Sequence, residues 1–154
     1  MINLKEKTEM TTRQNIEKTL WNACDSFRGK IDSSRYKDYI LSMLFVKYLS
    51  DVYVETRETY MKQYDGDERE RFVMDETSTF AYLYTNRNDP EIGQKINIAL
   101  AAIENNNSAK LHNVFRAIDF NSSVDFGEPK EKNAILKNLL EDFKDLDLRP
   151  SQLD

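Results

Sequence analysis

The sequence predicts an all-α fold, an irregular bundle of about four to six helices around one long central helix. The chain has only four glycines and three prolines, too few for the many turns of a strand-rich architecture. Apolar residues recur at helical spacing in several segments. The stretch 39–49 is apolar at nearly every position, which is typical of a helix packed on several sides. A length of 154 residues suits one domain with a real core.

The first helix is predicted to run from Thr11 to about Arg28, after a flexible leader over 1–11. Thr11 and the glutamine three residues later have the spacing of a capping box. Gly29 ends the helix, because glycine tolerates a left-handed backbone. Trp21 lies beside the apolar stripe and is expected to widen the buried face. The stripe consists of Ile16, Leu20, Ala23, Cys24 and Phe27.

The central helix follows, with Asp32, Ser33 or Ser34 as its cap, and fades near Tyr64. Its apolar run is too short, and too interrupted by charged residues, to span a bilayer. The charge-rich residues 67–77 are predicted to form a loop with at most one helical turn.

The aromatic residues of the segment 80–85 alternate with other side chains, as they would in a strand. This pattern predicts a short extended segment lying on the helices. Asp89 and Pro90 then indicate a helix start, with the aspartate as cap and the proline at the first helical position. That helix keeps its apolar period to about Glu104.

Residues 111–118 are predicted to form a short helix or turn, and 121–129 a loop. A last helix is predicted over 131–145. The inward residues of this helix are predicted to be Ile135, Leu136, Leu139, Leu140 and Phe143. We expect residues 12–150 to form a single domain. Ser151 could cap a further helix, so 151–154 would lead into a domain that this sequence does not contain.

Net charge is −5 and is unevenly distributed. Residues 1–64 carry 11 basic and 9 acidic side chains, and residues 65–154 carry 11 and 18. DNA contact is therefore expected in the first part, because phosphate binding needs a positive surface. A single cysteine rules out an internal disulfide and suits a reducing compartment. Residues 1–12 contain no apolar signal-peptide core, and we expect a cytoplasmic protein without membrane contact.

Residues with catalytic potential are sparse. His112 has no evident partner, which favours a structural histidine over a general base. Cys24 belongs to an apolar stripe and is interpreted as a buried thiol. The carboxylates of 65–76 indicate a solvated acidic loop and do not fill a calcium loop. No glycine-rich phosphate loop and no metal-ligand spacing occur in the sequence. We therefore assign no catalytic, cofactor-binding or metal-binding residue.

Four basic residues cluster around the first interhelical turn. One interpretation is a solvated, charged turn. The other is a small patch that contacts a DNA backbone or a partner protein. The four residues are Arg28, Lys30, Arg35 and Lys37.

Residues 20–29, LWNACDSFRG, and 36–51, YKDYILSMLFVKYLSD, resemble the opening of the methylation (M) subunit of type I restriction–modification systems, the HsdM-type DNA adenine methyltransferases. Segments 92–104 and 114–115, and a closing Ser-x-x-Leu, also resemble that family. The resemblance covers residues 14–153.

The resemblance implies a helical N-terminal domain followed by an S-adenosylmethionine-dependent domain that methylates N6 of a flipped-out adenine. It also implies partners: a specificity subunit, a second methylation subunit, a restriction subunit, and duplex DNA within the assembled complex. This sequence lacks the clustered glycines and the Asn/Asp-Pro-Pro-Phe/Tyr motif of the catalytic domain. The cofactor is therefore expected only in the missing catalytic domain.

The resulting hypothesis is a non-catalytic domain that serves assembly and DNA clamping in such a methyltransferase. A free-standing helical protein-interaction module is the alternative. An enzyme in its own right would need a site built from residues interpreted above as structural.

Overall fold

The computed structural model describes residues 12–63, 73–111, 114–115 and 118–152, and every regular element among them is helical. The all-α prediction is therefore confirmed, and none of the described helices is long and apolar enough to cross a membrane. In chain order the elements are α2 (Thr12–Phe27), α3 (Ser33–Gln63), the 3-10 helix η1 (Glu76–Ser78), α4 (Phe80–Thr85), α5 (Ile92–Asn106), α6 (Ser123–Phe126), α7 (Pro129–Phe143) and the 3-10 helix η2 (Pro150–Gln152).

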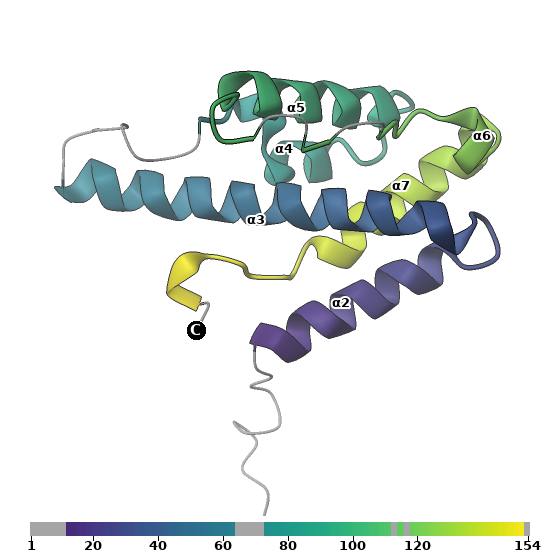
Figure 1. Cartoon of the computed structure of the whole chain (residues 1–154), viewed down its shortest axis with the longest axis horizontal. Helices are drawn as coiled ribbons and strands as arrows, with labels where there is room; N and C mark the ends of the chain where they lie inside the picture. The colour runs from purple at the N-terminus through teal and green to yellow at the C-terminus, as the bar shows by residue number, and fades with distance from the viewer. Residues whose placement is uncertain (1–11, 64–72, 112–113, 116–117, 153–154) are drawn as a thin grey trace, which may run out of the picture.

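The long helix α3 runs the length of the molecule, with α2 on one side and α4 and α5 on the other (Figure 1). Helix α7 passes behind α3 and contacts α2, α3, α4, α5 and α6. Helix α7 therefore occupies the centre of the core, and α3 is the longest helix that packs around it. The residues of α7 that were expected to face inward are all at most 2% exposed: Ile135, Leu136, Leu139, Leu140 and Phe143.

Helix α2 ends at Phe27, one residue before its predicted end, and Gly29 follows it with a φ of +80°. Thr11, the predicted cap, and the leader over 1–11 lie outside the described residues. The expectation that Trp21 widens the buried face is wrong, because its side chain is 64% exposed. One residue along a helix rotates a side chain by about 100°, which carries Trp21 past the edge of the stripe. Cys24 is only half-buried.

Helix α3 is capped by Asp32, whose Oδ1 accepts a hydrogen bond from the Ser34 amide at 3.1 Å. The helix ends at Gln63, next to the predicted end. Helices α2, α4, α7 and η2 pack against it, as expected for a helix covered on several sides. The coverage is incomplete, since Leu41 is 57% exposed and Val54 is 45% exposed.

Two polar side chains of α3, Ser50 and Asp51, hold other segments in place, and Lys47 pairs with one of them. The buried Lys47 ammonium lies 2.7 and 2.9 Å from the two carboxylate oxygens of Asp51. Asp51 Oδ2 also accepts a hydrogen bond from the Leu148 amide at 2.8 Å. Ser50 Oγ accepts from the amide of Phe80, the first residue of α4, at 2.8 Å. These contacts anchor both α4 and the C-terminal segment along α3.

The prediction of an extended segment over 80–85 is wrong, because these residues form α4. Thr79 Oγ1 accepts a hydrogen bond from the Tyr82 amide at 3.2 Å, which caps the helix. Phe80 and Leu83 are buried on one side, and the Phe80 and Tyr84 rings stack with centroids 6.4 Å apart. The hydrogen-bonded cap and the burial of one face of α4 thus outweigh the strand-like alternation of aromatic residues.

Helix α5 begins at Ile92, two residues after the proline that was expected to open it. Asp89 Oδ1 accepts a hydrogen bond from the Glu91 amide at 2.8 Å, so it stabilises a turn that precedes the helix. Upstream, the expected loop of 67–77 lies partly outside the described residues, and η1 supplies one helical turn at 76–78.

The prediction of a loop over 121–129 is wrong in part, because α6 forms within it. Ser122 Oγ accepts a hydrogen bond from the Asp125 amide at 3.2 Å and caps this short helix. In the segment 111–118, the described residues 114–115 form a turn. The 3-10 helix η2 begins at Pro150, one residue before the expected cap at Ser151.

Gly93 of α5 faces the backbone of the segment after α5, and an added Cβ would lie 2.7 Å from the Phe120 carbonyl oxygen. We expect Gly93→Ala to lower the free energy of unfolding by about 1–3 kcal/mol, although alanine favours a helix by about 1 kcal/mol. Urea denaturation measures the change. Exposed Gln94→Ala is the control and should stay within about 0.5 kcal/mol of the wild type. Equal stability of the two variants would contradict the close packing.

Candidate functional site

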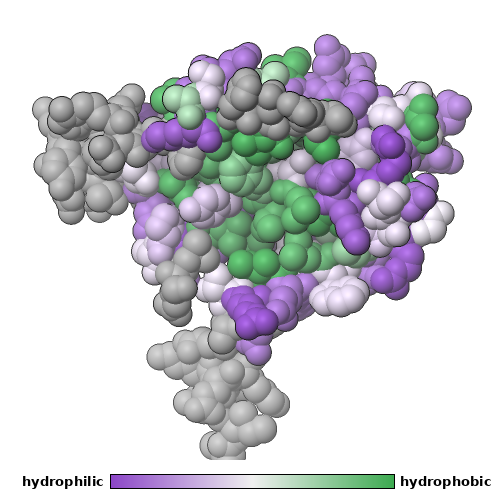
Figure 2. Space-filling view, viewed as in Figure 1, coloured by the Kyte–Doolittle hydropathy of each residue, from purple (hydrophilic) through white to green (hydrophobic). Residues whose placement is uncertain are grey.

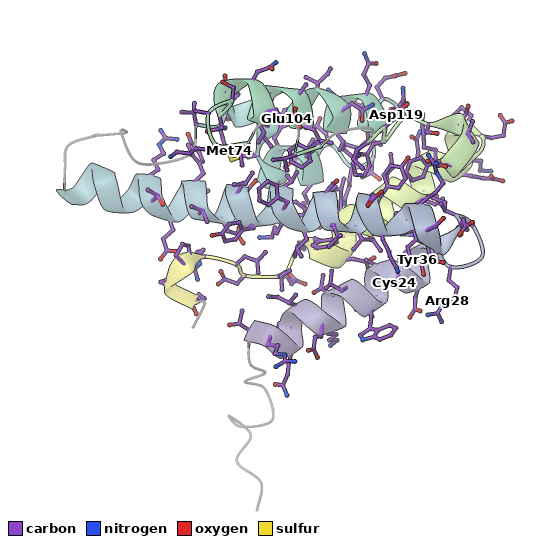
Figure 3. All side chains as sticks on the ribbon, in the orientation of Figure 1. Cys24, Arg28, Tyr36, Met74, Glu104 and Asp119 are labelled. Carbon is purple, nitrogen blue, oxygen red and sulfur yellow. The ribbon has the colours of Figure 1, made fainter. Side chains whose placement is uncertain are left out.

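The basic residues singled out in the sequence lie within or next to the corner where α2 turns into α3, and Figure 3 shows one of them, Arg28, at this corner. The amides of Lys30 and Ile31 both donate to the Phe27 carbonyl, at 3.0 and 3.2 Å. Ile31 is buried and ties the turn to the core, while Gly29 supplies the left-handed backbone. The position of the corner is therefore fixed by local hydrogen bonds and by one apolar anchor.

The four basic side chains do not form one continuous patch. Arg28 pairs with Asp25 at 3.3 Å on the surface. Arg35 turns toward α6 and binds Asp125. Lys37, two residues further along α3, projects about 200° away from Arg35 around the helix axis. Lys30 and Lys37 are exposed, and no carboxylate among the described residues forms an ion pair with either.

Asp125 is the buried centre of this corner, with a side chain only 3% exposed. Arg35 grips it with two nitrogens, Nε at 2.6 Å from Oδ1 and a terminal nitrogen at 2.9 Å from Oδ2. The Tyr39 hydroxyl donates to Oδ2 at 2.6 Å and lies 3.0 Å from the Asp119 carbonyl oxygen. The bidentate geometry is the strong form of an arginine–carboxylate pair.

Aromatic rings cover this carboxylate cluster. The Tyr39 ring packs against Phe126 and Phe120 with centroids 4.7 and 5.1 Å apart, and Phe27 stacks at 6.4 Å. Burial raises the pKa of the Tyr39 hydroxyl, and its hydrogen bond to Asp125 raises it further. Hydrogen bonding from Arg35 lowers the pKa of Asp125 against the opposing effect of burial. The carboxylate stays ionised because its partners replace the water it has lost.

A cavity of about 500 Å³ opens beside this cluster. Both oxygens of Asp125 are already bound by Arg35 and Tyr39, so the carboxylate is not positioned as a general base. Within the described part of the chain, no group of three His, Cys, Asp or Glu side chains is arranged to hold a metal ion. The cavity is lined by Gly29, Lys30, Val124, Asp125, Phe126, Gly127, Glu131, Ala134 and Ile135.

Sequence reasoning missed the roles of Asp125 and Tyr39. Two weak signals pointed to them: the cap spacing of Ser122 and Asp125, and the i, i+4 spacing of Arg35 and Tyr39 on one helix face. Of the other candidates, His112 lies outside the described residues, as does most of the acidic loop.

A family model described as the HsdM N-terminal domain matches residues 16–143, from the second turn of α2 to the end of α7. The chain belongs to this family. The resemblance seen in the sequence is thereby confirmed, and the matched range contains the Arg35–Tyr39–Asp125 cluster.

Two relatives extend the match. The type I restriction enzyme MpnII methylase subunit of Mycoplasma pneumoniae is 27% identical over 153 aligned positions, covering 90% of this chain and 27% of that protein. The crystal structure of a type I restriction-modification system methyltransferase subunit from Streptococcus thermophilus aligns with a TM-score of 0.69 and 26% identity, covering 89% of this chain and 34% of that one. This chain thus spans about a quarter to a third of the lengths of the two relatives.

Replacing Asp125 tests whether the cluster holds the corner together. We expect Asp125→Asn to lower the free energy of unfolding at pH 7 by about 1–3 kcal/mol, because it removes charge-assisted hydrogen bonds from a buried position. Exposed Asp25→Asn, which breaks only a surface pair, should change it by less than about 0.5 kcal/mol. Urea titration measures both.

The same variant should alter the acid dependence of stability. Because the folded-state pKa of Asp125 is lowered, its contribution is complete above about pH 4 and is lost as the pH falls through the folded value. Between pH 4 and pH 2 the wild type should therefore lose more stability than Asp125→Asn. Parallel curves for the two proteins would show that the ion pair contributes nothing.

Proposed function

We propose that this chain is the assembly and DNA-clamping domain of a type I restriction–modification methylase subunit, and that it performs no chemistry itself. Its membership of the HsdM N-terminal domain family, over residues 16–143, is the observation that carries the proposal. The names of the two relatives, a methylase subunit and a methyltransferase subunit of type I systems, support it.

Methyl transfer to adenine N6 is assigned to the part of the subunit that the relatives have beyond the matched region. This chain covers 27% and 34% of their lengths, which leaves room for a separate catalytic domain with S-adenosylmethionine as cofactor. The expected partners are a specificity subunit, a second methylation subunit and a restriction subunit. The family resemblance supports this set of partners.

DNA contact is assigned to the α2–α3 corner. Arg35 is held by Asp125 and Arg28 is paired with Asp25, so these two guanidinium groups are partly neutralised. The exposed Lys30 and Lys37 remain as cations without an ion-pair partner among the described residues. Lysine at an exposed position suits a sequence-independent phosphate contact, which positions a protein on the duplex without reading bases.

The salt dependence of DNA binding tests this assignment in the assembled methyltransferase. Each phosphate contact adds about 0.9 to the slope of log K against log salt. We expect Lys30→Ala and Lys37→Ala each to weaken binding and to reduce that slope by about 0.9. Lys18→Ala, an exposed lysine of α2 away from the corner, is the control and should leave the slope unchanged. An unaltered slope in both corner variants would remove the corner from the DNA interface.

Calorimetry and copurification test the non-catalytic assembly role. Titration of the 154-residue chain with S-adenosylmethionine should give no binding heat, because the sequence has no glycine-rich cofactor loop. The complete subunit should copurify with its specificity subunit. Micromolar cofactor binding by this chain would contradict the proposal that the cofactor binds only in a separate catalytic domain. Copurification with an unrelated protein instead of a specificity subunit would favour a free-standing interaction module.

A further inference from the structure

An apolar groove of about 360 Å³ lies between α2, the middle of α3 and the C-terminal segment. Figure 2 shows it as a hydrophobic area in the centre of the face, bordered by polar residues. Of its lining side chains only the tyrosine carries a polar atom. They are Ile16 of α2, Leu41, Leu44, Phe45 and Tyr48 of α3, and Leu148.

The α3 residues of the groove have the spacing of a helix-binding stripe. Leu41, Leu44, Phe45 and Tyr48 stand at i, i+3, i+4 and i+7, the pattern with which one helix receives the apolar face of another. The opposite side of α3 already faces the core through residues such as Met43, which is 0% exposed. Leu44, Phe45 and Tyr48 are partly buried at the edge of the core, whereas Leu41 remains 57% exposed.

The C-terminal segment is fixed along one wall of this groove. The Leu148 amide donates to Asp51 at 2.8 Å, and the Ser151 amide donates to Glu55 at 3.2 Å. Thr12 Oγ1 then donates to the Gln152 carbonyl oxygen at 2.7 Å. Residue 152, the last described residue, is thus held one helical turn from Ile16, a lining residue of the groove.

We propose that the groove receives the apolar face of a helix from the domain that follows this one in the complete methylase subunit. The proposal rests on the proposed function, which makes this chain one domain of a longer polypeptide. The matched family is an N-terminal domain, and the relatives are about three to four times longer than their matched parts. A domain that continues from residue 152 would be attached at the edge of the groove.

The size of the groove favours a tethered occupant over a separate protein. Stable complexes between separate proteins involve about 20–30 residues on each side, whereas this groove has six lining residues. A segment attached nearby binds intramolecularly at an effective concentration of the order of millimolar. A small apolar contact is then sufficient to hold two domains together.

A photo-crosslinker placed in the complete subunit identifies the occupant. Leu41→p-benzoylphenylalanine should crosslink within one polypeptide to a segment beyond residue 154, found by mass spectrometry of the digested protein. Ile98 of α5 is the matched control position, because it is 58% exposed and lies outside the groove. Crosslinks from position 41 to a second copy, to another subunit or to nothing would overturn the proposal.

A charge in the groove provides the second readout. In the complete subunit, Leu41→Glu should raise the rate of proteolytic cleavage between the two domains about tenfold, because cleavage follows the population of the undocked state. Ile98→Glu should change it less than about twofold. In the 154-residue chain both variants should melt at similar temperatures, since both positions are exposed. Equal cleavage rates in the complete subunit would overturn the proposal.

Failure of this inference is distinguishable from failure of the proposed function. A complete subunit that methylates DNA with its specificity subunit, yet shows neither the crosslink nor the faster cleavage, would overturn only the occupant of the groove. A polypeptide that forms no such methyltransferase would overturn the proposed function itself.

Discussion

Burial of the apolar side of α7 is the constraint on which the rest of the domain depends. This helix contacts α2, α3, α4, α5 and α6, and its inward residues are almost fully excluded from water. Its α2 neighbour is distant in sequence: Ser26 Oγ donates to Asp142 at 3.0 Å across 116 residues. The apolar faces of the earlier helices therefore converge on α7, the last α-helix among the described residues.

Polar side chains on α3 then fix the positions of segments that are too short to be held by their own contacts. Tyr39 holds the α6 region through Asp125, while Ser50 and Asp51 hold the start of α4 and the C-terminal segment. A four-residue helix such as α6 has little intrinsic stability, so it depends on such contacts. Tyr39, Lys47, Ser50 and Asp51 all lie in the stretch that resembles the methylation subunit. The residues that carry the resemblance therefore act in the architecture of the domain.

The sequence predicts best the features that depend on the local helical spacing of apolar residues. Spacing and end signals predict the ends of α2 and α3 to within about one residue, and the inward residues of α7. Helix α7 itself spans Pro129–Phe143, two residues earlier at each end than the predicted 131–145. Of the wrong predictions, α4 involves a tertiary contact, the hydrogen bond from its first amide to Ser50. Trp21 is exposed because it lies one residue past the buried stripe. Of the candidate site, sequence reasoning identified the corner. It could not show that Arg35 is occupied, because Asp125 lies 90 residues away.

The arrangement on α3 connects the two proposed contacts of this domain. Lys37 and Leu41 are four residues apart and therefore share one side of the helix, the side that the described core leaves uncovered. Helix α3 is a single element of 31 residues, anchored at the corner by Arg35 and in its middle by Asp51. A domain that docks at Leu41 would consequently set the direction in which Lys37 meets a DNA backbone. Clamping would then require no internal motion of the helical domain, because a change in docking angle at the groove moves the basic corner as a rigid body.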